Sequence, residues 1–150
     1  MTEPTLAQRI ERAVRDYIRG CNDGGATAIA ACFSADAVHY FPGSQKWSGA
    51  TTIGENFAQR VRDFGQCWTV DQLLIDAGRC AAALEWTQFD RSGRVVRGVD
   101  WIVLEPQTLL IREVRPYVAA FRADAARQEL QDFDYAGRGY PMDARPVKVF

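Results

Sequence analysis

The chain has 150 residues, of which 47% are hydrophobic and 25% are charged, and its formal net charge at pH 7 is -1. This length suits one domain with its own core, and this composition excludes disordered and fibrous classes of protein. Because basic and acidic residues are balanced, we expect neither a nucleic acid nor a membrane as partner. The sequence shows neither a long apolar run nor an apolar N-terminal core, which predicts a cytoplasmic protein.

The residues that usually bind metals or carry redox chemistry are few and scattered. The four cysteines show no close C-x-x-C pairing, which predicts buried free thiols rather than a zinc site or a redox pair. His39 is the single histidine, so a centre built from several histidines is excluded. Motifs of nucleotide-binding proteins, dinucleotide-binding proteins, serine hydrolases and zincins do not occur. We therefore predict no metal and no cofactor.

Three segments of the first half show the periodicity of amphipathic helices. Apolar residues recur at steps of three and four over residues 5–20, 26–33 and 52–64. Thr5 with Gln8, and Thr52 with Glu55, have the spacing of capping boxes at helix starts. Gly20 is expected to end the first helix.

The second half changes to the pattern of β-strands. Strand-like runs cover residues 67–76, 80–89, 94–105 and 109–121, after a short one at residues 37–41. The sequence DRSG at residues 90–93 predicts a hairpin turn. Helices grouped before strands predict an α+β domain, with the helices on one face of a curved antiparallel sheet. We place the domain at residues 1–130 and expect residues 131–150, rich in aromatic side chains, to dock on it or on a partner subunit.

The strand at residues 94–105 carries an unusual acid. Alternation places Asp100 on one face with Ile102, and Val99 with Trp101 on the other. Both faces are mostly apolar, so we expect a second subunit to cover the face that the helices leave open, giving a homodimer.

The carboxyl group of Asp100 is costly to ionise between apolar neighbours, which predicts a raised pKa and a neutral acid. A salt bridge with Arg97, Arg112 or Arg115 is the alternative.

Several stretches resemble a known superfamily. The segment RDYIRGCNDGGATAIAACFSADAVHYFPG at residues 15–43 is similar to its opening, and GVDWIVLE and IREVRPYV are similar to its last two long strands. Together with the order of the predicted helices and strands, these segments resemble the ketosteroid isomerase, SnoaL and limonene epoxide hydrolase superfamily, which is also called nuclear-transport-factor-like. The likeness covers roughly residues 6–118. It implies a cone-shaped domain whose three N-terminal helices pack on the concave face of the sheet.

The resemblance also implies site residues. The oxyanion-stabilising tyrosine of ketosteroid isomerase falls on Tyr17, its protonated aspartic acid falls on Asp100, and its general base falls on Tyr40. An ordinary phenol is not a base near neutral pH, so standard steroid isomerisation is not expected. Strand register favours Tyr40 in the pocket, whereas a slip of one residue would bring in His39, whose ordinary pKa suits proton transfer.

Two other members of the superfamily offer further comparisons. The last aspartate of limonene epoxide hydrolase falls near Pro116, and the strand with Glu85 lacks the matching arginine. SnoaL-like cyclases imply an acid or base on the last strands, where Glu113 and Arg115 share a face opposite Pro116.

We therefore expect an isomerase, lyase or cyclase without cofactor, acting on a hydrophobic carbonyl compound such as a polyketide or terpenoid. Proton transfer and oxyanion stabilisation would be carried by Asp100, Tyr17, His39 and Tyr40. The predicted substrate contacts are Trp68, Trp86, Trp47, Phe57, Val114 and Pro116. Tryptophans also suit a core or an interface, and that alternative stays open. Two further alternatives stay open. One is a non-catalytic member that binds an apolar ligand or a protein, and the other is an epoxide hydrolase or dehydratase variant.

Overall fold

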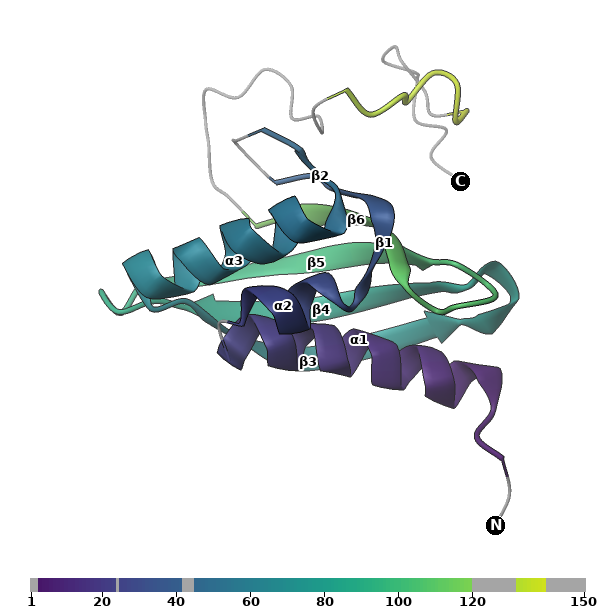
Figure 1. The fold of residues 1–150 in the computed structure, drawn as a ribbon, viewed down its shortest axis with the longest axis horizontal. Helices are drawn as coiled ribbons and strands as arrows, with labels where there is room; N and C mark the ends of the chain where they lie inside the picture. Colours follow the sequence, from purple (N-terminus) through teal and green to yellow (C-terminus); the bar gives the residue numbers. More distant parts are fainter. Residues whose placement is uncertain (1–2, 24, 42–44, 120–131, 140–150) are drawn as a thin grey trace, which may run out of the picture.

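The structure is a computed structural model that describes residues 3–23, 25–41, 45–119 and 132–139. In chain order these residues form α1 (Leu6–Asp23), α2 (Ala26–Ala30), β1 (Phe33–His39), β2 (Trp47–Ser48), α3 (Ala50–Phe64), β3 (Cys67–Asp76), the short 3-10 helix η1 (Ala77–Arg79), β4 (Ala81–Phe89), β5 (Val95–Leu104) and β6 (Ile111–Val118). Figure 1 shows the helices lying across one face of the curved sheet. The predicted α+β class is confirmed.

The six described strands form one sheet in the order β2-β1-β6-β5-β4-β3. Strands β3 to β6 form an antiparallel meander, but β1 runs parallel to β6, so the expectation of a purely antiparallel sheet was wrong for this pair. A parallel pair needs a crossover connection, and here α3 and four strands lie between β1 and β6 along the chain. Strand β2 was missed because two residues are too few to show alternation.

The helix ends follow the sequence in part. The capping box at α1 is confirmed, since the Gln8 amide donates to Thr5 Oγ1 at 3.2 Å and the Thr5 amide donates to Gln8 Oε1 at 2.8 Å. Gly20 does not end α1, which runs on to Asp23. At α3 the start predicted from Thr52 was wrong, because the helix begins at Ala50 without a side-chain cap.

The strands of the meander agree closely with the sequence pattern. The DRSG turn joins β4 to β5, with Gly93 at a φ of 82° and the Asp90 amide donating to the Arg94 carbonyl at 3.2 Å. Strand β1 begins earlier than predicted, at Phe33, and ends at His39. No helix in the described part of the chain combines the length and apolar character needed to cross a bilayer.

The two faces of the sheet differ as alternation predicted. On β5, Asp100 and Ile102 are buried beneath the helices. On the opposite face, Val99 is 37% exposed and Trp101 is 40% exposed, and Tyr117 on β6 is 46% exposed. This outer face therefore presents large apolar side chains to solvent.

Residues 132–139 contact β1 and β6 of the same chain. Phe133 packs against Tyr40 with 5.6 Å between ring centroids, and Arg138 donates to both carboxylate oxygens of Glu113 at 2.9 and 2.6 Å. The predicted domain boundary near residue 130, and the end of the chain from residue 140, lie outside the described residues.

Candidate active site

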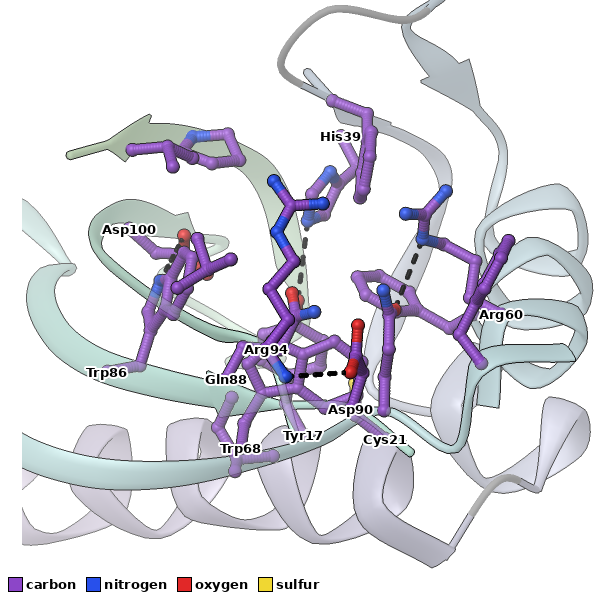
Figure 2. Close-up of a pocket in the computed structure, with 18 residues that line it drawn as sticks. Tyr17, Cys21, His39, Arg60, Trp68, Trp86, Gln88, Asp90, Arg94 and Asp100 are labelled. Atoms are coloured by element: carbon purple, nitrogen blue, oxygen red, sulfur yellow. Dashed lines mark hydrogen bonds between the residues drawn. The ribbon is translucent and has the colours of Figure 1, made fainter. Parts of the chain in front are cut away.

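A cavity of about 380 Å³ lies between α1, α3 and the inner face of the sheet. Its volume is in the range of small-molecule sites. It is lined by Tyr17, Ile18, Cys21, His39, Phe41, Phe57, Arg60, Phe64, Gln66, Trp68, Trp86, Gln88, Asp90, Arg94, Val96, Asp100, Pro116 and Val118. Figure 2 shows these side chains converging from the helices and the strands. Buried groups form its inner wall, and exposed ones such as Phe64 and Arg94 form its rim.

Asp100 lies in the inner wall and is 5% exposed. The indole Nε1 of Trp86 donates to Asp100 Oδ1 at 2.8 Å. Trp86 faces Gly98 across the β4–β5 pair, and a Cβ at Gly98 would come within 2.6 Å of the indole. The absence of a side chain at Gly98 thus makes room for the tryptophan that orients the acid.

Burial raises the pKa of Asp100 to about 7, although the hydrogen bond from Trp86 acts in the opposite direction. Among the described residues no arginine lies within ion-pair distance of this carboxyl group. Arg97 instead donates to Thr87 Oγ1 at 2.7 Å, and Arg115 pairs with Glu113 at 3.4 Å. The salt-bridge alternative for Asp100 is therefore contradicted.

Tyr17 and His39 form a second polar group in the cavity. The Tyr17 hydroxyl and His39 Nε2 lie 3.3 Å apart, and the imidazole is 2% exposed. Burial lowers the pKa of His39 to about 3, so the ring is neutral at pH 7. Its Nδ1 has no hydrogen-bond partner within the part of the chain that the structure describes. Burial also raises the pKa of Tyr17 well above its ordinary value.

The structure places His39 in the cavity and Tyr40 outside it, so the register prediction for these two residues was wrong. Tyr40 packs with Phe133 on the other side of β1. The pairing of β1 with β6 shifts register between Phe33 and Val38, and such an irregularity exchanges which side chains face inward.

The match to a family model supports the resemblance seen in the sequence. Residues 14–114, more than half of the chain, match the model of the SnoaL-like domain. The chain belongs to the SnoaL-like domain family. Its fold matches the wider nuclear-transport-factor-like superfamily, as the sequence predicted. A search of the curated proteins gave no match to the chain.

Solved structures extend the comparison. A Methylobium petroleophilum PM1 protein of unknown function, with a cystatin-like fold, is 39% identical over 96% of this chain and 100% of its own, with a TM-score of 0.87. The epoxide hydrolase/cyclase-like enzyme SalBIII, of pyran ring formation in salinomycin, is 22% identical over 75% of this chain and 92% of its own (TM-score 0.63). A candidate polyketide cyclase from Xanthomonas campestris pv. campestris is 18% identical over the same shares of the two chains (TM-score 0.62). The last two show the shared fold.

Four of the six substrate contacts predicted for this SnoaL-like chain line the cavity, namely Trp68, Trp86, Phe57 and Pro116. Trp47 lies behind the wall, packed against His39 and edge-on to Phe57 with ring centroids 5.6 and 5.2 Å away. Val114 is wholly buried in the core. The predictions for Trp47 and Val114 as lining residues were therefore wrong.

The acids of the epoxide hydrolase and cyclase patterns are not in the cavity of this SnoaL-like domain. Glu85 is exposed on β4, and Glu113 binds Arg138 on the outer side of β6. Among the described residues, no group of three or more histidine, cysteine or acidic side chains is arranged to hold a metal ion.

Two cavity arginines of this SnoaL-like domain were not predicted from the sequence. Arg60 follows Phe57 by three positions, which places both on one face of α3. Arg94 lies just before β5, six positions before Asp100, and this even spacing directs both side chains toward the cavity side of the sheet. Both spacings were visible in the sequence, but a spacing alone does not show which face lines a cavity.

Proposed function

We propose that this protein transfers protons on a hydrophobic carbonyl compound, as an isomerase, lyase or cyclase that needs no cofactor. The observation that carries the proposal is the buried Asp100 carboxyl group with a pKa of about 7, in one cavity with the Tyr17 hydroxyl. An acid whose pKa lies near the working pH is well matched to proton transfer. Structural neighbours named for cyclase chemistry support the reaction class.

In this scheme the ionised Asp100 removes a proton from the carbon next to the substrate carbonyl. Trp86 occupies Oδ1, so Oδ2 is the oxygen that takes the proton. The protonated acid then returns it to another carbon in an isomerisation, or to a leaving group in an elimination. In a cyclase, the enolate carbon would instead attack a second carbonyl carbon of the substrate, and the oxygen of that carbonyl would take the proton back from Asp100.

The Tyr17 hydroxyl stabilises the enolate oxygen. With its proton on Nε2, the neutral His39 ring donates to the Tyr17 oxygen, and the phenol proton can then donate to the substrate in place of the Cys21 thiol beside it. A donor fixed in this way stabilises developing charge without reorganising. His39 is thus a positioning residue, since a pKa of about 3 makes it a poor base at neutral pH.

This assignment changes the role first expected for Asp100. The sequence and the resemblance implied a neutral acid that donates a hydrogen bond to the oxyanion. A pKa of about 7 instead makes Asp100 about half ionised at pH 7, and it is the described cavity group best matched to proton transfer there.

Hydrogen exchange in a simple ketone tests the proposed function. In D2O, the protein is expected to exchange the α-hydrogens of 2-tetralone faster than buffer alone, as followed by proton NMR. Because the carboxylate is the active form, the rate should rise with pH through about 7 and then level off. Exchange no faster than in buffer would contradict the proposal. A rate that stays the same throughout this pH range would contradict it as well.

We further propose that the outer face of the sheet pairs two copies of the chain. Trp101 and Tyr117 lie on it with Leu74, which is 72% exposed. Large exposed apolar patches mark association sites. The expected mass by light scattering is that of two chains, and Trp101→Glu should give one chain, because it would replace a large apolar contact with a charge that the interface must desolvate. Leu6→Glu, at an exposed apolar position on α1, is the control and should stay dimeric. A wild-type mass of one chain at micromolar concentration would contradict the proposal.

A further inference from the structure

Arg60 of α3 reaches the cavity as a partly desolvated cation. Its guanidinium lies over the Phe41 ring at 4.4 Å and 5.5 Å from the centroid of Phe64, and its Nε donates to Gln66 Oε1 at 3.2 Å. Burial lowers its pKa from the ordinary value. Among the described residues, no carboxylate lies within ion-pair distance of it. Stacking and one neutral hydrogen bond hold this side chain, and its two terminal nitrogens lack a partner in the same residues.

Arg94 brings a second cation to the rim. It follows the turn that joins β4 to β5, and its backbone amide donates to Asp90 Oδ1 at 3.1 Å. Asp90 Oδ1 also accepts from the backbone amide and hydroxyl of Ser92, at 2.9 and 2.6 Å, so this carboxylate is engaged within the turn. The Arg94 guanidinium makes no ion pair with the residues that the structure describes. Figure 2 shows its side chain extending over the cavity.

Arg60 is placed apart from the acid of the proposed chemistry. In Figure 2, Asp100 and Trp86 lie on one side of the cavity and Arg60 lies on the other, with Arg94 between them. A ligand that fills the space thus meets the acid at one end, Arg60 at the other and Arg94 between them.

We infer that the substrate is a keto acid, whose carboxylate binds Arg60 and Arg94 at the rim while its carbonyl lies at Tyr17. This inference rests on the proposed function for the position of the carbonyl. Guanidinium groups bind carboxylates through paired hydrogen bonds, and such bonds are stronger than those between neutral groups. A bound carboxylate would supply the counterion that Arg60 lacks among the described residues, and it would add a partner for Arg94, whose charge already acts on the Asp90 carboxylate.

The charge of the lining favours a single negative charge on the ligand. Arg60 and Arg94 contribute two positive charges, and Asp90 contributes one negative charge at the same rim. Asp100 must also ionise in the proposed mechanism. While Asp100 is protonated, a monoanionic carboxylate cancels the single net positive charge of this set. With Asp100 ionised it leaves one net negative charge, whereas a dianionic phosphate leaves more in either state and adds repulsion toward both aspartates.

Binding of matched acids and amides tests the inference without turnover. The probes are 4-oxo-4-phenylbutyrate, 5-oxo-5-phenylpentanoate and 6-oxo-6-phenylhexanoate. Each acid is compared with its own primary amide, and both are titrated into the protein by calorimetry at low ionic strength. The best acid is expected to bind about tenfold more tightly than its amide. Arg60→Gln and Arg94→Gln should each weaken that acid by about fivefold or more and change the amide less than about twofold.

Arg12→Gln, at an exposed position on α1, is the matched control and should change neither the Kd of the acid nor the Kd of its amide. Arg94 is exposed, so Arg94→Gln keeps the test valid even if loss of Arg60 stacking disturbs α3. Equal binding of acid and amide, acid binding that survives the Arg94 substitution, or no acid binding at millimolar concentration would overturn the inference. Arginine-dependent acid binding without hydrogen exchange would leave it standing and refute the proposed function instead.

Discussion

Asp100→Asn is expected to lower the rate of α-hydrogen exchange by about 10²- to 10⁴-fold, which is the usual contribution of a positioned acid or base. The amide keeps the shape of the side chain and can still accept from Trp86, but it cannot carry a proton. The rise of rate with pH through about 7 should vanish in the same variant. NMR exchange rates measured from about pH 5 to about pH 9 check both effects.

The same substitution is expected to stabilise the folded protein at high pH. The pKa of Asp100 is raised from 3.8 to about 7 on folding, so the folded state binds the extra proton between these values. The stability linked to this group is complete below about pH 4 and is lost as pH rises through about 7. Relative to wild type, Asp100→Asn should therefore gain roughly 2 to 3 kcal/mol between about pH 5 and about pH 8.

Urea unfolding at the two pH values measures that difference. Asp36→Asn, the same change at an exposed position on β1, is the control and should leave both exchange and stability close to wild type. A variant that lost stability at high pH would show that the carboxylate is favourably paired in the cavity. Retained exchange would show that another group carries the proton.

Tyr17→Phe has the second-largest expected effect, a fall in exchange rate of about 10²-fold at saturating ketone. The phenol interacts more strongly with the enolate than with the ground-state ketone, so KM should change little. Because Asp100 remains, the midpoint of the pH profile should stay near 7 while the plateau falls. Steady-state exchange rates across the pH range separate this pattern from that of Asp100→Asn.

Removal of the hydroxyl also leaves His39 Nε2 without its described partner, which is expected to cost about 1 to 3 kcal/mol of stability. Tyr117→Phe makes the same change on the outer face of the sheet and should affect neither rate nor KM. An unchanged plateau in Tyr17→Phe would remove this hydroxyl from the mechanism.

Much of the fold could be predicted because local and global signals agree along the meander. The pattern of β5 placed Asp100 on one face with Ile102, the resemblance pointed that face inward, and the DRSG turn identified the hairpin before the strand. The parallel pairing of β1 with β6 could not be predicted in this way, since it joins residues about 75 positions apart and leaves no local periodicity. Its irregular register is also what brings His39 inward in place of Tyr40.

The site was predictable only where a residue is unusual for its surroundings. Asp100 stands in an apolar run, and Tyr17 lies on the apolar face of α1. The Trp86 bond to Asp100 depends on cross-strand register and on the missing side chain of Gly98, which a sequence does not display by itself. Arg60 resembles any surface cation until the fold turns its helix face toward the sheet.

The ionisation of the Asp100 side chain in the free protein is the most direct test of the central claim. Carbon-13 NMR of labelled aspartate, compared with Asp100→Asn to assign the resonance, follows this carboxyl group from about pH 3 to about pH 9. We predict a midpoint of about 7, far above the ordinary 3.8. A midpoint near 4 would contradict it, because an acid already ionised well below neutral pH lacks the matched proton affinity on which the proposed chemistry depends.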